Sequence, residues 1–247
     1  MKISTLVTFL LLISAAALII WRLHPLWRGD QAVLQARTVA ARVLAEELAR
    51  RQPGAQALAI GNPYTQDAGR RADIYAFEKA GLLGVRQGLQ GRIRLKTVAF
   101  PTLKPGARED PRAVPIAPAC RTPLSYLVAP DAFDALAREH ADCHLFVSLI
   151  GLPAGIAQTP LWQTYGAPVF GLLLPDLRLL GTPAAIEEAF RSGRIVAAVI
   201  DKPGASTAPA APDTDYHAVF DQLFLLLTAD NVGETLRKYP ALFKGLR

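Results

Sequence analysis

The strongest constraint on the fold is the alternation of short, continuous apolar runs with amphipathic helical stretches. Six apolar runs follow one another along the chain, at residues 55–61, 93–100, 145–151, 168–174, 195–200 and 224–228. Strands that are apolar on both faces are expected where both faces of their sheet are covered, which is typical of parallel sheets. The alternation therefore predicts an α/β fold, a Rossmann-like three-layer sandwich with a mostly parallel sheet.

The helices expected around these runs are marked by apolar side chains at helical spacing. They cover residues 31–51, 74–88, 133–140, 182–193 and 230–239. The fourth has Thr182 as its N-cap and Pro183 as its first helical residue. Glycines 81, 84, 88 and 91 fall within or just beyond the second helix, and we expect them to allow close helix packing rather than to bind phosphate.

Residues 3–21 contain no charged side chain and are predominantly apolar. A helix of this length measures about 28 Å, close to the roughly 30 Å hydrocarbon thickness of a bilayer. The alternative is a cleaved signal peptide, with Lys2 as its basic region and Ala15–Ala17 as its small-residue cleavage site. We favour an uncleaved N-terminal transmembrane helix, because cleavage there would leave Leu18 to Trp21 on the new N-terminus.

The flanking charges and the form of the segment predict opposite orientations of this anchor. Arg22 and Arg28 follow the apolar segment and only Lys2 precedes it, which by the positive-inside rule favours a cytoplasmic body. The short N-terminal tail and the signal-sequence form of the segment favour export. We expect a single-pass protein of the cell inner membrane with its body in the periplasm.

The chain is expected to divide into a transmembrane anchor (1–22), a membrane-proximal helix (23–54) and the Rossmann-like domain (55–247). Within this domain, residues 101–130 contain seven prolines, too many for the interior of a helix or strand. We expect this Pro-rich excursion to be an ordered, extended surface segment, and residues 203–215 to be a flexible loop.

The formal net charge of +6 is unevenly distributed. Residues 1–112 carry 17 Lys and Arg against 8 Asp and Glu, whereas the rest of the chain carries 10 against 13. The basic half follows the predicted anchor, so it either lies next to anionic lipid or forms a solvated helix face. Nucleic acid is not an expected partner, because no nucleic-acid-binding module accompanies the charge. The expected partners are the lipid bilayer, through residues 3–21, and either a membrane protein or a small polar solute.

Cys120 and Cys143 have two interpretations. In an exported domain they form a disulfide that pins the Pro-rich excursion to the start of the third strand, or they are two unrelated thiols. A zinc site with His140 and His144 is disfavoured, because Cys143 and His144 are neighbours on a strand and point to opposite faces. We expect no metal and no cofactor.

The common catalytic signatures are missing. Ser125 and Ser148 do not lie in a G-x-S-x-G elbow, and the chain has no phosphate-binding G-x-x-x-x-G-K-[ST] loop. We therefore assign no catalytic residue.

Ligands of open α/β sheets bind just beyond the carboxyl ends of the strands. The candidate ligand-binding residues there are Asn62, Tyr64, Thr65, Ser148, Asp176 and Asp201, although ordinary turns and helix caps use the same residue types. Asp176 and Asp201 would suit a cation or acid–base chemistry if they meet. Thr228 and Asp230 follow the last run, and Asp230 is better explained as a helix cap.

Three short motifs resemble one lobe of the type I periplasmic solute-binding proteins. They are Gly-Asn-Pro-Tyr at 61–64, a helix from Asp131 leading into Val-Ser-Leu-Ile-Gly at 147–151, and Gly-Ala-Pro-Val at 166–169. The resemblance covers residues 55–200 and implies that the loops after the strands contact a sugar or an amino acid. The chain departs from the family in being too short for a second full lobe and in having the Pro-rich excursion.

These observations favour a membrane-anchored, non-enzymatic binding or interaction subunit on the exported side of the membrane. The alternative is a single-lobe periplasmic solute-binding or sensor protein. A second alternative is a hydrolase or transferase with an unrecognised site around Asp176 and Asp201.

Overall fold

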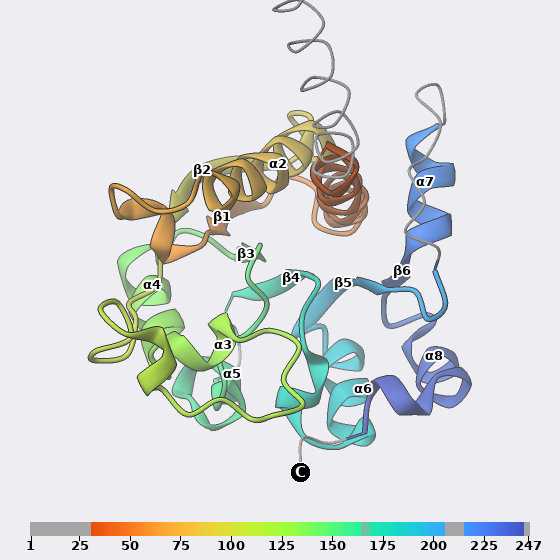
Figure 1. The fold of residues 1–247 in the computed structure, drawn as a ribbon. Coiled ribbons are helices and arrows are strands. Elements are labelled where there is room, and N and C mark those ends of the chain that lie inside the picture. The colour runs from red at the N-terminus through yellow and green to blue at the C-terminus, as the bar shows by residue number, and fades with distance from the viewer. Residues whose placement is uncertain (1–30, 165, 167, 206–214, 245–247) are drawn as a thin grey trace, which may run out of the picture.

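The protein is described by a computed structural model that covers residues 31–164, 166, 168–205 and 215–244 (Figure 1). Within these residues, six strands form one sheet in the order β2-β1-β3-β4-β5-β6. The first five strands are parallel, and β6 is antiparallel to β5. The predicted α/β fold with a mostly parallel sheet is confirmed.

Each predicted apolar run contains one strand. The strands are β1 (Gln56–Ile60), β2 (Arg94–Ala99), β3 (Leu145–Ser148), β4 (Val169–Leu173), β5 (Ile195–Asp201) and β6 (Phe224–Leu227). All of β3 and all of β5 except its last residue are buried, because helices cover both faces of the sheet. At one edge, β2 is largely exposed, which explains why its sequence accommodates charged side chains.

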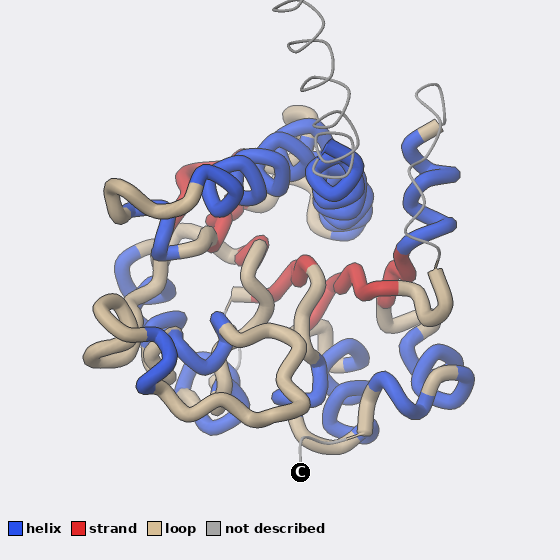
Figure 2. Tube along the Cα trace, in the orientation of Figure 1, coloured by secondary structure: helices blue, strands red, loops and turns tan. Residues whose placement is uncertain are grey.

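Helices cover the two faces of the sheet in separate layers (Figures 1 and 2). One layer holds a helix over residues 31–51, here named the leading helix, together with α2 (Ala72–Leu89) and α7 (Tyr216–Leu223). The other layer holds α4 (Ala132–Glu139), α5 (Pro160–Gln163), α6 (Pro183–Arg191) and α8 (Val232–Lys238). The connecting helices are η1 (Pro63–Gln66), η2 (Pro111–Ala113), α3 (Leu124–Leu127), η3 (Ile156–Gln158), η4 (Leu177–Leu180) and η5 (Pro240–Leu242). The predicted three-layer arrangement is therefore confirmed.

The α6 helix begins and ends where the sequence predicts. The Thr182 side chain accepts a hydrogen bond from the backbone N–H of Ala185 at 3.2 Å, and Pro183 is the first helical residue. Gly193 follows the helix with φ of 75°, a conformation that favours glycine.

The leading helix is part of the α/β body, which corrects the expected separation of a membrane-proximal helix at residues 23–54. Ala40, Leu44 and Leu48 are completely buried against the sheet. A Cβ added to Gly171 of β4 would lie 2.3 Å from Leu48 Cδ1, so the helix contacts the centre of the sheet. Removal of the helix would expose the part of this face that Ala40, Leu44 and Leu48 cover.

Glycines bring the leading helix and α2 into close contact. A Cβ at Gly84 would lie 2.2 Å from the carbonyl oxygen of Thr38, and a Cβ at Gly88 would lie 2.3 Å from that of Arg42. Any side chain at either position would collide with helix backbone. The predicted packing role is therefore confirmed for these two glycines, whereas Gly91 follows α2 in a left-handed turn with φ of 74°.

The Pro-rich excursion is ordered and has a small core of its own. Tyr64, Ala107 and Leu127 are buried together, and an isolated antiparallel bridge joins Leu103 to Val128. Besides the expected extended stretches, the excursion contains η2 and α3.

Strand β6 and the helix before it differ from a simple parallel pattern. The α7 helix, which the apolar periodicity did not reveal, passes directly into β6 at Phe224. No loop separates α7 from β6, so β6 begins at Phe224 beside Asp201, the last residue of β5. From there β6 is antiparallel to β5. Thr228 and Asp230 therefore lie at the opposite edge of the sheet from the carboxyl ends of the parallel strands, which corrects their expected placement.

The predicted transmembrane helix at residues 3–21 lies outside the described residues. Within the part of the chain that the structure covers, no helix is both long and apolar enough to cross a bilayer.

Candidate functional site

A cavity of about 830 Å³ opens beyond the carboxyl ends of β1, β3, β4 and β5. Its walls come from the first turns of the leading helix, the start of α2, residues 121–124 of the Pro-rich excursion, the loops after β3, β4 and β5, and residues 242–243. This is the edge at which ligands bind in open α/β sheets. The volume lies within the range of sites that bury a small organic ligand, about 300 to 1,000 Å³.

Asn62 lies at this cavity, as the sequence predicts, but much of its polar surface is already engaged. Its side-chain oxygen accepts a hydrogen bond from the backbone N–H of Tyr64 at 3.0 Å and so caps η1. Its own backbone N–H donates to Glu78 Oε1 at 3.1 Å. Asn62 therefore shapes the turn after β1 and places Glu78 beside it.

Tyr64 and Thr65 are not among the residues that line the cavity. The Tyr64 hydroxyl donates to the carbonyl oxygen of Ala107 at 2.5 Å, and its ring is buried in the small core of the excursion. The Thr65 hydroxyl donates to the carbonyl oxygen of Asn62 at 2.7 Å. Both residues hold the loop after β1 against the excursion.

Ser148 is completely buried at the end of β3. Its hydroxyl donates to the carbonyl oxygen of Gly151 at 2.6 Å and accepts a hydrogen bond from the N–H of Ile150 at 3.4 Å. The side chain closes the turn that carries Leu149 and Ile150 into the cavity wall, and it does not face a ligand.

Asp176 lines the cavity but is fully engaged by other groups. Its carboxylate accepts hydrogen bonds from Arg178 Nε at 2.7 Å and Nη2 at 2.6 Å, and from the backbone N–H groups of Arg178 and Arg121. Burial acts to raise the pKa of Asp176, but the hydrogen bonds outweigh burial and hold the pKa below its ordinary value. Asp176 therefore has no free acceptor position for a cation, and it is a structural group.

Asp201 lies at the end of β5, where its side chain is exposed to the cavity. Loss of hydration beside the walls raises the pKa of its carboxyl, and the positive charge of Arg121 opposes this shift. Because Asp176 is bound by Arg178, the carboxylate pair that the two residues would form if they met is not available for acid–base chemistry.

Arg37 of the leading helix is the cavity residue that the sequence did not point out. Only 6% of Arg37 is exposed, and its guanidinium lies over the Phe77 ring at 3.9 Å from the centroid. Nε donates to the carbonyl oxygen of Phe77 at 2.9 Å, and Nη2 donates to that of Leu149 at 3.0 Å. Among the described residues, Nη1 has no hydrogen-bond partner. Arg37 thus joins the leading helix to α2 and to the loop after β3, and it retains unused donors at the cavity.

Glu78 is a second buried, charged residue of this wall, on α2. Burial lowers the pKa of Arg37 to about 10 and raises the pKa of Glu78, while the attraction between the two charges opposes both shifts. Among the described residues, the Arg37 guanidinium donates to backbone carbonyl groups rather than to a carboxylate, and Glu78 acts on it through charge attraction without a direct ion pair.

A sequence signal for both residues does exist. Arg37 continues the apolar stripe formed by Val33, Ala40 and Leu44, and Glu78 occupies the corresponding face of α2. A charged residue in an apolar stripe is exceptional, because burial of an unpaired charge is costly. A charged residue in such a stripe therefore indicates that Arg37 and Glu78 are buried, charged residues with a special role.

Arg178 holds the Pro-rich excursion against the cavity. Its Nη2 donates to the carbonyl oxygen of Ala119 at 2.7 Å while the guanidinium binds Asp176, and both charged side chains are almost completely buried. The backbone of Arg121 adds a further bond to Asp176. The cavity wall at residues 121–124 therefore depends on a buried ion pair.

Both cysteines are free, so the disulfide interpretation is wrong for this structure. The Cys120 sulfur accepts a hydrogen bond from the N–H of Thr122, next to the cavity wall. Cys143 precedes β3 and is buried at the other end of that strand, where loss of hydration raises the pKa of its thiol. The length of β3 separates the two sulfurs.

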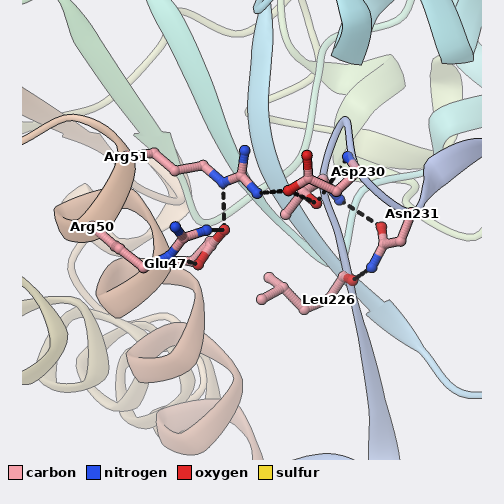
Figure 3. Close-up of polar contacts among 7 residues, drawn as sticks. Glu47, Arg50, Arg51, Leu226, Asp230 and Asn231 are labelled. Carbon is pink, nitrogen blue, oxygen red and sulfur yellow. Dashed lines mark hydrogen bonds and ion pairs between the residues drawn. The ribbon is translucent and has the colours of Figure 1, made fainter.

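The opposite edge of the sheet carries a cluster of charged residues around the end of the leading helix (Figure 3). Glu47 binds both Arg50 and Arg51, and Arg51 also binds Asp230. Asp230 is therefore an ion-pair partner rather than a helix cap. This cluster ties the leading helix to the loop between β6 and α8, far from the cavity.

No protein-family model and no curated protein matches this chain. Solved structures that are similar to it include solute-binding proteins, two of them described as transporter components. One is a carbohydrate transporter solute-binding protein from Agrobacterium radiobacter in complex with D-arabinose, with a TM-score of 0.47 and 12% identity over 84% of this chain and 63% of that one.

A second is the Caulobacter myo-inositol-binding protein, with a TM-score of 0.46 and 15% identity over 81% of this chain and 61% of that one. A third is a periplasmic solute-binding protein from Actinobacillus succinogenes with bound D-allose, with a TM-score of 0.43 and 8% identity over 80% and 62%. The chain thus spans about three fifths of the length of these structures.

Proposed function

We propose that the protein is a non-enzymatic binding protein that holds a small solute in the cavity beyond the carboxyl ends of its strands. The observation that carries this proposal is Arg37, a buried guanidinium with unused donors in the wall of a ligand-sized cavity. A buried charge without a contacting counter-charge is costly in the free protein, and a bound acceptor would reduce that cost. The commitment of Asp176 and Ser148 to structural bonds favours binding over catalysis.

The test is a thermal-shift screen of polar and anionic solutes against the full chain. A ligand at one hundred times its Kd stabilises the folded state by about 2.7 kcal/mol, which raises the Tm of a domain of this size by roughly 5 to 10 °C. Ala76→Trp places an indole in the cavity wall and should abolish the shift. Gln87→Trp adds the same ring to an exposed position of the same helix and should leave the shift unchanged. An Ala76→Trp variant that responds like the wild type would exclude this cavity as the site.

The proposal includes an inner-membrane anchor at residues 3–21 and a body on the periplasmic side. A reporter fused after Arg247 tests the orientation, because a periplasm-dependent reporter should be active and a cytoplasm-dependent reporter should be silent. The opposite pattern would overturn the exported placement and leave the cavity proposal standing.

An interaction subunit is the second candidate function. Its supporting observation is that Val33 and Phe77, with 56% and 37% of their surface exposed, both border the cavity. A partner bound there should be lost on Val33→Asp, and co-purification from membranes with and without this change tests it.

A further inference from the structure

The cavity wall is mainly apolar. The apolar side chains come from every element around it, and those at the strand ends and in the loops that follow include Leu149, Ile150, Leu173, Leu174 and Ile200. A solute with many hydroxyl groups would leave most of them unpaired against such a surface, at a cost for each one. The composition of the wall therefore favours a ligand with an apolar body.

Few polar groups of the wall are available to a ligand. Asp176 is engaged by Arg178, Asp73 binds Arg71, and the side-chain oxygen of Asn62 caps η1. The charged residues that remain on the wall are Arg37, with Glu78 near it, and Asp201, with Arg121 near it. Arg37 is the buried cation among them, with a donor that no described residue uses, and the ligand group that matches such a donor is an anion.

The charge of this anion is limited by Glu78. A dianion at Arg37 would meet the Glu78 carboxylate on the same wall and lose much of the energy gained from the guanidinium. A single negative charge fits this balance better. Such heads include the carboxylate of a fatty acid and the phosphodiester of a lysolipid.

From these observations, and on the basis of the proposed function, we propose that the cavity binds an amphiphile with one singly charged anionic head and an apolar chain. The head accepts hydrogen bonds from Arg37 Nη1, and the chain lies on the apolar wall.

The position of the cavity fits this class of ligand. Val33 and Leu34 of the leading helix line the cavity, so the helix enters the body at its rim. The predicted membrane anchor precedes this point by about ten residues. Val33 and Phe77 expose apolar surface at the same place, which an apolar chain can follow into the cavity.

The experiment uses the full chain in nanodiscs of zwitterionic lipid. Binding of decanoate below its micellar concentration is measured by calorimetry and compared with binding of decan-1-ol and glucose. We expect decanoate to bind at least tenfold more tightly than decan-1-ol, because a hydrogen bond to a charged group is worth about 1.5 to 3 kcal/mol.

Two arginine variants test the site. Arg37→Met should weaken decanoate at least tenfold, whereas Arg86→Met, at an exposed position of α2, should not change its affinity. Arg37→Lys keeps the charge and the fold if the Met variant is unstable, and it should retain part of the affinity. The ¹³C carboxyl signal of labelled decanoate reports the pKa of its carboxyl group. Contact with Arg37 should make this pKa lower for bound decanoate than for free decanoate. An Arg37 that only supports the fold would not cause this difference.

The outcomes separate this inference from the function on which it rests. Equal binding of decanoate and decan-1-ol, or an Arg37→Met variant with wild-type affinity, would overturn the anionic head. Binding of glucose but not decanoate, sensitive to Ala76→Trp, would overturn the amphiphile and leave the proposed function intact. Failure of every solute would overturn both. The last measurement adds lysophosphatidylglycerol to the decanoate complex. Displacement of decanoate would identify a lysolipid as the ligand class, and no displacement would identify a free fatty acid.

Discussion

Replacing Gly84 by alanine tests whether contact between the leading helix and α2 holds the body together. The added Cβ would lie 2.2 Å from the Thr38 carbonyl oxygen, 2.8 Å from Ala41 Cβ and 2.9 Å from the Arg42 backbone nitrogen. Two of these three atoms belong to helix backbone, which cannot rotate away as a side chain can. The two helices would have to move apart.

The expected loss follows from two opposing effects. Overpacking of a core costs about 1 to 3 kcal/mol, and a clash with backbone belongs at the upper end. The higher helix propensity of alanine than of glycine raises the free energy of unfolding by about 1 kcal/mol. We therefore expect Gly84→Ala to lower the free energy of unfolding by about 2 kcal/mol and the Tm by roughly 4 to 8 °C.

Gly233→Ala in α8 is the matched control. Its Cβ would lie 3.2 Å from Glu187 Oε1, the far end of a flexible side chain, so this variant should be as stable as the wild type or slightly more stable. Urea denaturation monitored by circular dichroism compares the two variants. If Gly84→Ala proved as stable as Gly233→Ala, the close helix contact would be refuted.

Three further predictions concern the excursion and the cysteines. Asp176→Asn should cost about 3 kcal/mol at neutral pH, because it leaves a buried guanidinium unpaired. The pKa of Asp176 is lowered in the folded state, so its stabilisation is complete above the unfolded pKa of about 3.9 and is lost as the pH falls through the native value. Urea denaturation curves of the variant and the wild type should therefore converge in acid, and a constant difference would contradict this assignment. Cys120 should react with a maleimide in the folded protein and Cys143 only after unfolding, and intact mass should show two thiols even after oxidation. Tyr64→Phe removes the hydrogen bond to Ala107 and should lower the free energy of unfolding by about 1 kcal/mol. It should also accelerate proteolysis within residues 103–118. Unchanged cleavage would show that this hydrogen bond does not keep the excursion ordered.

The positions of the strands were predictable because each buried strand is a continuous apolar run. The direction of β6 was not, because it depends on the direct junction between α7 and Phe224 and not on the apolarity of the strand itself. The leading helix was recognisable as a helix, but its burial depends on contacts such as that of Leu48 with Gly171, which are distant in sequence.

The candidate site was predicted at the correct edge but with only part of its residues. Asn62 and Asp201 do lie at the cavity, since strand ends determine their position. Tyr64 and Ser148 are structural, because polar residues that follow strands also serve loops and turns. Arg37 was missed because an arginine on an Arg-rich helix is normally solvated, and only its alignment with apolar neighbours marks it as buried.

The burial of the leading helix also sets a time order for biosynthesis. The helix is made early, yet Leu48 packs on Gly171, about 120 residues later in the chain. At a synthesis rate of about 5 to 20 residues per second, this interval lasts roughly 6 to 25 s. During that time β1, β2 and β3 are made, but the face of the helix around Leu48 still lacks its contact with β4. The leading helix can therefore reach its final packing only after β4 has been synthesised.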